Sequence, residues 1–374
     1  DPDMASMIHN EMRKHGIKLV LGYTVEGFKE KDNGVEVLLK DNPSLQADMV
    51  VLAIGVTPDT VLAKEAGLEL GIKESIVVND RMETSVPDIY AAGDAVQVKH
   101  YVTGNDALIS LAGPANKQGR IIADNICGGD SRYLGSQGSS VIKVFDMTAA
   151  TTGINETNAK KSGLEVDTVI LSPMSHAGYY PGGKVMTMKV VFEKETYRLL
   201  GAQIIGYEGV DKRIDVLATA IHAGLNATQL KDLDLAYAPP YSSAKDPVNM
   251  AGFMIDNIAK GTLKQWHLED MDKISKDKDV VLLDVRTVGE FSRGHIDGFK
   301  NIPVDELRER ISEIEKGKPV YLICQSGLRS YIASRILEGN GYETYNFSGG
   351  FRFYDAVVND RALIERAYAC GMDY

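Results

Sequence analysis

The last hundred residues of the chain alternate short apolar segments with helical ones, and this pattern restricts the fold more than any other feature. The candidate strands include Val280–Leu283, Val320–Ile323 and Thr344–Phe347, and the helix candidate Ser330–Leu337 lies between the last two. Such alternation predicts a sheet covered by helices. About 100 residues is also the usual size of one domain. The sequence therefore predicts a separate α/β domain over residues 261–374.

The only cysteine in that predicted domain that follows an apolar strand is Cys324. It begins the loop 324–329 (CQSGLR), which leads into a helix near Ser330. Backbone N–H groups in a strand–loop–helix turn, together with the helix N-terminus, favour an anion. A thiolate there is stabilised and nucleophilic, and Arg329 adds a positive charge nearby. The sequence predicts a nucleophilic Cys324 supported by Arg329, with a buried structural cysteine as the alternative.

Further motifs flank this loop in a fixed order. They are Asp284-Val285-Arg286, Glu290, Gly294-His295-Ile296, Asn301-Ile302-Pro303 and Gly349-Gly350. Together with CQSGLR they resemble the rhodanese (sulfurtransferase) domain along nearly all of 270–360. The resemblance implies that Cys324 carries sulfane sulfur as a persulfide, that Asp284 and Arg286 tie the loop to the core, and that His295 is structural. An inactive rhodanese-like module stays open, whereas the related phosphatases have a loop one residue longer.

Two apolar motifs in the N-terminal part end at glycine. Val50–Pro58 (VVLAIGVTP) contains Gly55, where a backbone can approach a ligand closely. Its apolar run, Asp48–Ile54, predicts a strand buried on both faces. Thr84–Ala95 (TSVPDIYAAGDA) predicts another strand, which ends at Gly93-Asp94. A carboxylate at that edge is placed to bind a ribose or ribityl hydroxyl, and a helix N-cap is the alternative.

The region between these parts has a mixed pattern. Its predicted strands and helices are Ser140–Phe145, Asn155–Ser162, Val166–Leu171, Val185–Phe192, Leu199–Ile205 and Lys212–Ala223. The last of these carries an apolar stripe at helical spacing. This pattern predicts an α+β domain. Two tyrosine-rich motifs lie in it, Ser175–Gly183 (SHAGYYPGG) and Asp234–Asn249 (DLAYAPPYSSAKDPVN).

Taken together, these motifs resemble the flavin-dependent disulfide reductases of the glutathione reductase type. The resemblance implies that VVLAIGVTP closes an NAD(P)H domain and that TSVPDIYAAGDA is the second FAD motif. The implied cofactor-binding residues are Gly55, Gly93, Asp94 and Ala95. The tyrosine-rich motifs resemble the dimerisation domain of coenzyme A-disulfide reductases and NADH-dependent persulfide reductases, some of which carry a C-terminal rhodanese domain. FAD, NAD(P)H, coenzyme A as substrate and a homodimer are therefore implied.

The predicted fold class is α/β, with remnants of two dinucleotide-binding domains, an α+β dimerisation domain and a C-terminal α/β rhodanese domain. The predicted domain boundaries are 1–60, 61–132, 133–260 and 261–374. The sequence has no GxGxxG fingerprint and no cysteine in the context of the flavin-facing redox cysteine, and it begins without Met. We therefore expect a fragment of a longer polypeptide. Cys127, at a helix end, is predicted to be structural, and Cys370 has no predicted role.

Tyrosines of the middle domain are candidates for proton donation. The resemblance implies that a tyrosine pair reaches into the partner subunit's active site, where a phenol can protonate a leaving thiolate. Tyr179 and Tyr237 match best, Tyr180 and Tyr241 are alternatives, and interface packing is the competing role. His176 and His222 lack partners at metal-ligand spacing, so no metal site is predicted.

Two functions remain open from the sequence. The first is an FAD-dependent reductase of coenzyme A disulfide or persulfide, fused to a sulfurtransferase; the second is a non-reducing dimeric scaffold that carries only a sulfur-carrier domain. The charge of −11 argues against nucleic acid and anionic membranes. Three cysteines and the lack of a long apolar run favour a reducing, cytoplasmic setting. The sequence leaves open NADH or NADPH, disulfide or persulfide, and the physiological sulfur donor.

Overall fold

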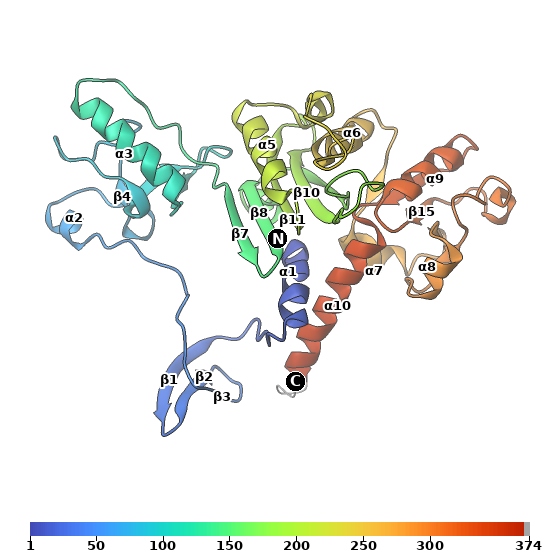
Figure 1. Ribbon diagram of the computed structural model, residues 1–374, viewed down its shortest axis with the longest axis horizontal. Coiled ribbons are helices and arrows are strands. Elements are labelled where there is room, and N and C mark those ends of the chain that lie inside the picture. The colour runs from blue at the N-terminus through green and yellow to red at the C-terminus, as the bar shows by residue number, and fades with distance from the viewer. Residues whose placement is uncertain (370–374) are drawn as a thin grey trace. The chain divides into compact units, whose positions relative to one another are not determined.

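The computed structural model of the protein describes the backbone of residues 1–369 and the side chains of residues 1–365 (Figure 1). The chain forms two compact units. One combines Asp1–His15 with Val141–Asp360, and the other contains Gly16–Ser140 and the described residues from Arg361 onwards. Among the described residues, no helix is both long and apolar enough to cross a membrane.

The C-terminal part of the first unit contains a five-stranded parallel sheet. Its strand order is β12-β16-β15-β13-β14. The strands are β12 (Gln265–Trp266), β13 (Val281–Asp284), β14 (Lys300–Asn301), β15 (Val320–Ile323) and β16 (Thr344–Phe347). Because β15 is central and all strands run the same way, the carboxyl ends of β13, β15 and β16 meet at one edge. The motifs that contain Asp284, Cys324 and Gly350 are brought together there.

Helices and turns connect these strands. They are η4 (Leu268–Asp270), α7 (Met271–Ile274), α8 (Val288–Ser292), η5 (Ile311–Glu313), α9 (Leu328–Glu338) and α10 (Gly350–Ala369). Helix α9 packs on β15 and β16. Its buried positions include Ser330, Ala333, Ser334 and Leu337, which recur at helical spacing. The α/β fold predicted for this region is confirmed, and helix α9 begins two residues before the predicted Ser330.

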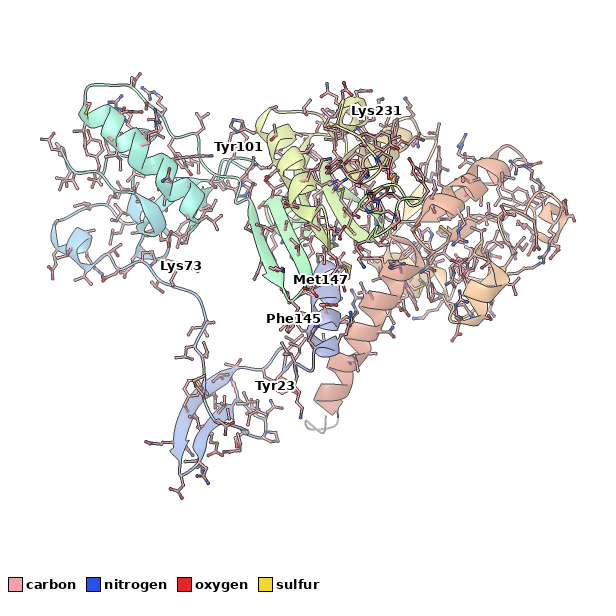
Figure 2. The ribbon with its side chains drawn as sticks, viewed as in Figure 1. Tyr23, Lys73, Tyr101, Phe145, Met147 and Lys231 are labelled. Atoms are coloured by element: carbon pink, nitrogen blue, oxygen red, sulfur yellow. The ribbon has the colours of Figure 1, made fainter. Side chains whose placement is uncertain are left out.

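The middle of the chain folds as a five-stranded antiparallel sheet in the order β7-β8-β11-β10-β9. The strands are β7 (Ser140–Val144), β8 (Met147–Gly153), β9 (Val166–Leu171), β10 (Met186–Glu193) and β11 (Leu199–Gly206). Figure 2 labels Met147 at the start of β8 and Phe145 in the turn before it. Strand β8 is absent from the prediction, because its sequence MTAATTG lacks large apolar residues beyond its first position.

Four helices belong to this sheet: α4 (Glu156–Lys161), α5 (Val210–His222), η3 (Ala227–Asp232) and α6 (Pro247–Ala259). Helix α5 lies across β8 and β11 (Figure 1). Helix α6 packs on η3, where Lys231, labelled in Figure 2, forms an ion pair with Asp256 at 2.7 Å. The α+β pattern predicted for this region is confirmed.

The N-terminal helix α1 (Pro2–Lys14) is held to this sheet by a buried charge cluster. The Nζ atom of Lys189, on strand β10, lies 2.7 Å from Asp3 and 2.6 Å from Glu156. The Asp1 carboxylate lies 3.4 Å from the same Nζ and accepts hydrogen bonds from the first turn of α4. A buried ammonium needs such compensation, because an unpaired charge in a protein interior is strongly destabilising.

The antiparallel and parallel sheets share one apolar core. Trp266 of β12 packs on Phe347 with ring centroids 4.4 Å apart, in a cluster that also contains Met147 and Ile205. The Oγ of Ser348 accepts a hydrogen bond from the Ile170 backbone at 3.0 Å. The parallel sheet and the antiparallel sheet are therefore joined by a continuous core within one compact unit.

The second unit has two small sheets. The antiparallel sheet β1-β2-β3 comprises β1 (Val25–Lys31), β2 (Gly34–Leu39) and β3 (Leu45–Ala47). The other unites β4 (Ile76–Val77), β5 (Val96–Lys99) and β6 (Asp106–Ala107). Its helical segments are α2 (Val61–Glu65), η1 (Ile72–Glu74), η2 (Gly93–Ala95) and α3 (Ala112–Ile126).

Two strand predictions in this unit are wrong. Asp48–Ile54 forms no strand and pairs with no strand of the described residues, and Ile54 is 90% exposed. A buried parallel strand needs neighbours at both edges, and here none is hydrogen bonded to it. The segment Thr84–Ala95 also forms no strand; it has one isolated bridge between Glu83 and Tyr90, and the strand of that region is β5, which follows Asp94.

Candidate functional site

Cys324 follows the central strand β15 directly, so its position is set by the sheet. It is fully buried in an apolar cluster that also contains Ala333 and Leu337 of α9. The N–H of Gly327 donates a hydrogen bond to Sγ at 3.1 Å, and the hydroxyl of Ser330 donates another at 3.2 Å. Both donors stabilise negative charge on sulfur. The predicted anion-stabilising loop is therefore present at Cys324.

Other amides of the loop remain available. The backbone N–H groups of Gln325, Ser326 and Leu328 donate to no atom of the described residues. Gly327 has a φ of +98°, a left-handed conformation that glycine adopts without strain, and it is the N-cap of α9. Successive free amides in such a turn form an anion-binding concavity. The loop can therefore hold a second anionic sulfur or an oxyanion beside Sγ.

The first turn of α10 is hydrogen bonded to the backbone of the Cys324 loop. The Phe351 N–H donates to the Cys324 carbonyl at 2.8 Å, and the Arg352 N–H donates to the Gln325 carbonyl at 3.2 Å. Gly350 has a φ of +71°, and a Cβ there would lie 2.6 Å from the backbone N of Ser326. The glycine is required because the loop backbone lies directly against it.

Asp284 and Arg286 fix the loop to the end of β13. The Arg286 guanidinium donates to both carboxylate oxygens of Asp284, with the shortest contact at 2.7 Å, and lies 3.8 Å from the centre of the Phe351 ring. Its Nη1 also donates to the Gln325 side chain at 3.4 Å. Both residues are buried. They therefore tie the loop to the core, as predicted from the sequence.

Arg329 is engaged by a carboxylate. Two of its N–H groups donate to the two oxygens of Glu290, each at 2.7 Å. Glu290 also accepts hydrogen bonds from the backbone and hydroxyl of Thr287, the N-cap of α8. The hydrogen bonds from Arg329 lower the pKa of Glu290 to about 2. The positive charge predicted beside Cys324 is thus present, but it is paired with a permanently ionised carboxylate.

His295 lies apart from this chemistry. Its ring stacks on Phe291 with centroids 4.0 Å apart, and its Nδ1 interacts with the Phe291 carbonyl at 3.2 Å. These contacts support the predicted structural role. Cys127 caps the C-terminus of α3 and is exposed, whereas Cys370 lies outside the described residues. No group of three or more metal-ligand residues was found in the part of the chain that the structure describes.

The structure brings Tyr179 and Tyr237 together, although they are far apart in the sequence. Their hydroxyl oxygens lie 2.8 Å apart, and the side chains are 77% and 45% exposed. The hydrogen bond with Tyr179 raises the pKa of Tyr237 above that of an ordinary phenol. A phenol with its ordinary pKa of about 10 is already protonated at neutral pH, so Tyr237 has a proton to donate. Tyr180 instead packs edge-on against His176 at 5.6 Å.

A buried arginine that the sequence analysis missed organises the tyrosine loops. Arg213 of α5 donates to Asp246 at 2.9 Å and to the backbone carbonyls of Ser175 and Tyr241. Burial raises the pKa of Asp246, but hydrogen bonds from Ser242, the Val248 N–H and Arg213 outweigh it and hold the pKa below its usual range. A cavity of about 570 Å³ borders this cluster and is lined by Arg213, Tyr237 and Tyr241.

The motif TSVPDIYAAGDA ends in a turn that can accept a ligand. Gly93 has a φ of +83°, and its N–H donates to the Gln118 side chain of α3 at 2.7 Å. Asp94 follows in η2; it is exposed and accepts no hydrogen bond from the described residues. Such an exposed carboxylate can accept hydrogen bonds from the hydroxyl groups of a ligand. Gly55 has a φ of +90°, and a Cβ added there would have no atom within 4 Å, so its surroundings are open.

Three protein families match consecutive parts of the chain. The pyridine nucleotide-disulphide oxidoreductase family matches residues 1–119, its dimerisation domain matches residues 139–247, and the rhodanese-like domain matches residues 267–356. The chain is therefore a member of the pyridine nucleotide-disulphide oxidoreductase family with a C-terminal rhodanese-like domain. This finding confirms the predicted family and fold class, whereas the predicted domain boundaries remain predictions.

Similar solved structures include a reduced CoADR-RHD from Bacillus anthracis, which is 46% identical with a TM-score of 0.93 over 96% of this chain and 64% of that chain. Another is an NAD-dependent persulfide reductase from A. fulgidus, 40% identical with a TM-score of 0.87 over 95% of this chain and 65% of that chain. Both match the chain across all three family regions.

Among curated relatives, an NAD(P)H sulfur oxidoreductase (CoA-dependent) from Pyrococcus abyssi is 36% identical over 66% of this chain and 55% of its own length. A coenzyme A disulfide reductase from Staphylococcus aureus is 34% identical over 68% of this chain and 57% of its own length. The chain thus spans little more than half the length of the curated relatives it matches.

Proposed function

We propose that the chain belongs to an FAD-dependent oxidoreductase that reduces coenzyme A disulfide or coenzyme A persulfide with NAD(P)H, and that its rhodanese-like domain carries sulfane sulfur on Cys324. The observation that carries this proposal is the cradle around Sγ, with the hydrogen bonds from Gly327 and Ser330 and the free amides beside them. The names of the relatives favour this function over that of a non-reducing scaffold.

The sulfur-transfer step needs only the described loop. The Cys324 thiolate attacks the outer sulfur of a persulfide donor R–S–SH. A bond forms between Sγ and that sulfur, the S–S bond of the donor breaks, and its electron pair leaves with the thiolate RS⁻. An acceptor thiolate then attacks the outer sulfur of the Cys324 persulfide. The bond between that sulfur and Sγ breaks, and Cys324 leaves as a thiolate. The free amides of Gln325, Ser326 and Leu328 stabilise the terminal sulfur anion.

The reductase half of the proposal rests on the tyrosine pair and on Asp94. Tyr237, hydrogen bonded to Tyr179, is the proton donor to a leaving thiolate, and the pair acts in the partner subunit of a homodimer. Asp94, which lies in one turn with Gly93 and Ala95, would hold a hydroxyl of FAD. Gly55 would allow the backbone to approach NAD(P)H closely. FAD, when bound, relays two electrons from NAD(P)H to the sulfur substrate. A reducing, cytoplasmic setting suits such thiol chemistry.

The transfer half can be tested on the chain as given. The purified protein is incubated with a persulfide donor, desalted and digested, and the peptide that contains Cys324 is examined by mass spectrometry. The proposal predicts an added mass of one sulfur atom on Cys324 that cyanide or a thiol removes. Absence of that adduct with every persulfide donor would refute the sulfur-carrier role.

The reductase half is tested in a protein that joins these residues to the two dinucleotide fingerprints. NAD(P)H oxidation is followed with coenzyme A disulfide and with coenzyme A persulfide. The proposal predicts turnover with at least one of these substrates. Turnover with neither would leave the scaffold as the better description.

A further inference from the structure

Arg286 and Arg329, the two arginines of the Cys324 site, each have their positive charge neutralised by a carboxylate. Arg286 is paired with Asp284, and Arg329 is paired through two parallel hydrogen bonds with Glu290. Two parallel N–H···O bonds to one carboxylate are the strongest form of such a pair. A third cation, Arg352, has an exposed side chain without a partner among the described residues, and solvent screens its field.

Glu290 is held in place independently of Arg329. The Thr287 N–H donates to its Oε2 at 3.0 Å and the Thr287 hydroxyl donates at 2.9 Å, in the capping box of α8. Its side chain is 23% exposed and that of Arg329 is 30% exposed. The carboxylate is therefore a fixed part of the loop surroundings and does not depend on a mobile surface contact.

We propose that Glu290 determines which sulfur donors Cys324 accepts: by neutralising Arg329, it disfavours small dianionic donors such as thiosulfate and leaves the site selective for persulfides. This inference rests on the proposed sulfur-carrier function. It assigns Glu290 a specificity role that is separate from its contact with the helix cap.

The charge balance of the two reactions explains the selection. With thiosulfate, the Cys324 thiolate attacks the sulfane sulfur, a Cys324–S–S⁻ persulfide forms, and sulfite leaves with two negative charges. The site then holds three negative charges, while the positive charge of Arg329 is already neutralised by Glu290. With an organic persulfide, the attacked molecule carries at most one charge and a single thiolate leaves. A free Arg329 would stabilise the first reaction more than the second, because Coulomb attraction grows with the charge of the partner.

The test compares kcat/KM for thiosulfate with kcat/KM for 2-mercaptoethanol persulfide in the whole chain, with cyanide or a thiol as acceptor. The wild-type protein should prefer the persulfide. Glu290→Gln keeps the shape of the side chain and removes its charge. It should therefore raise the thiosulfate-to-persulfide ratio of kcat/KM on the order of tenfold, which is equivalent to about 1.4 kcal/mol of electrostatic stabilisation. The increase should disappear at high salt, because the freed charge is partly exposed.

The matched control is Glu338→Gln. Glu338 pairs with Arg335 on the same helix α9, three residues apart, so this change also removes one carboxylate from an arginine pair. The ratio should stay at the wild-type value in Glu338→Gln. It should also return towards the wild-type value in the double variant Glu290→Gln/Arg329→Gln, in which the unpaired cation is gone.

The inference is overturned if wild-type protein prefers thiosulfate, a result that needs no variant to fold. It is also overturned if Glu290→Gln changes both donors equally or not at all while its circular dichroism and unfolding midpoint show a folded protein. A different result, no persulfide on Cys324 from any donor, refutes the proposed function and not the role of Glu290. The two failures are therefore distinguishable.

Discussion

The close contact between Gly350 and the Cys324 loop allows us to predict how far the substitution Gly350→Ala displaces that loop. A Cβ at Gly350 would lie 2.6 Å from the Ser326 backbone N and 2.7 Å from the Gln325 carbonyl carbon. Ordinary contacts begin at 3.4 Å, so Gly350→Ala must push the loop away by about 0.8 Å, that is 3.4 minus 2.6 Å. The atoms in contact are backbone atoms, so no side-chain rotation can absorb this movement.

The expected loss is large for catalysis and moderate for stability. Misplacement of reacting groups by about 1 Å can cost on the order of 10²-fold in rate, so sulfur transfer should fall between about 10- and 100-fold. Alanine at a φ of +71° adds about 1–2 kcal/mol of backbone strain. Gly341→Ala is the matched control, because Gly341 has a φ of +78° with nothing within 4 Å of a Cβ. It introduces the same strain without the clash.

The assay measures persulfide formation on Cys324 and transfer to cyanide, together with the free energy of unfolding, for both variants. Gly350→Ala should lose transfer far beyond its loss of stability, whereas Gly341→Ala should lose only stability. Equal transfer rates in the two folded variants would show that the position of the loop against α10 does not control the chemistry.

Three further predictions concern Tyr237, the binding of FAD and the charge of Glu290. In a complete reductase, Tyr237→Phe should lower turnover more than cofactor binding, whereas Tyr241→Phe should not, and unchanged turnover in Tyr237→Phe would leave packing as the role of Tyr237. The purified chain should bind FAD weakly, because Asp94 supplies only part of the contact and the chain has no GxGxxG turn for the pyrophosphate; stoichiometric flavin in a visible spectrum would contradict this. The pKa of Glu290, about 2, lies below its ordinary value of 4.5. Its stabilising effect is therefore complete above pH 4.5 and is lost as the pH falls towards 2. Partial exposure limits this effect to about 1 kcal/mol, and the stability difference between wild type and Glu290→Gln should shrink over that interval.

Local pattern predicted the elements whose neighbours lie nearby in the sequence. The predicted strands Val166–Leu171 and Val320–Ile323 agree with the structure. The Cys324 cradle was also accessible from sequence, because a strand, a short loop and a helix N-terminus fix the direction of its amides. These features depend on the period of the apolar residues and on turn chemistry, which short windows of sequence contain.

The errors arise where a segment depends on partners elsewhere. Asp48–Ile54 has the composition of a buried strand, yet strand formation requires hydrogen-bond neighbours that no local pattern supplies. The Arg329–Glu290 pair joins residues on two different helices, so the sequence predicted the charge of Arg329 without its compensation. Arg213 was missed because a lone arginine in an amphipathic helix gives no sign that it is buried.

The pairing of Tyr179 with Tyr237 shows how a resemblance and a structure complement each other. The resemblance favoured Tyr179 and Tyr237 but left Tyr180 and Tyr241, which lie in the same motifs, as alternatives. The 2.8 Å contact between the two hydroxyl oxygens singles out Tyr179 and Tyr237 as a coupled pair. Their role as proton donors stays a prediction that the Tyr237→Phe experiment addresses.

The most direct test of sulfur transfer by this chain compares how much sulfane sulfur the wild-type protein and the variant Cys324→Ser carry. Wild-type protein and Cys324→Ser are exposed to the same persulfide donor, and cyanide-labile sulfur is measured per chain, with Cys127→Ser as a control for an exposed thiol. We expect one labile sulfur on wild type and on Cys127→Ser, and none on Cys324→Ser, because a serine hydroxyl does not carry sulfane sulfur. Wild-type sulfur transfer by Cys324→Ser would contradict the assignment of Cys324 as the sulfur carrier.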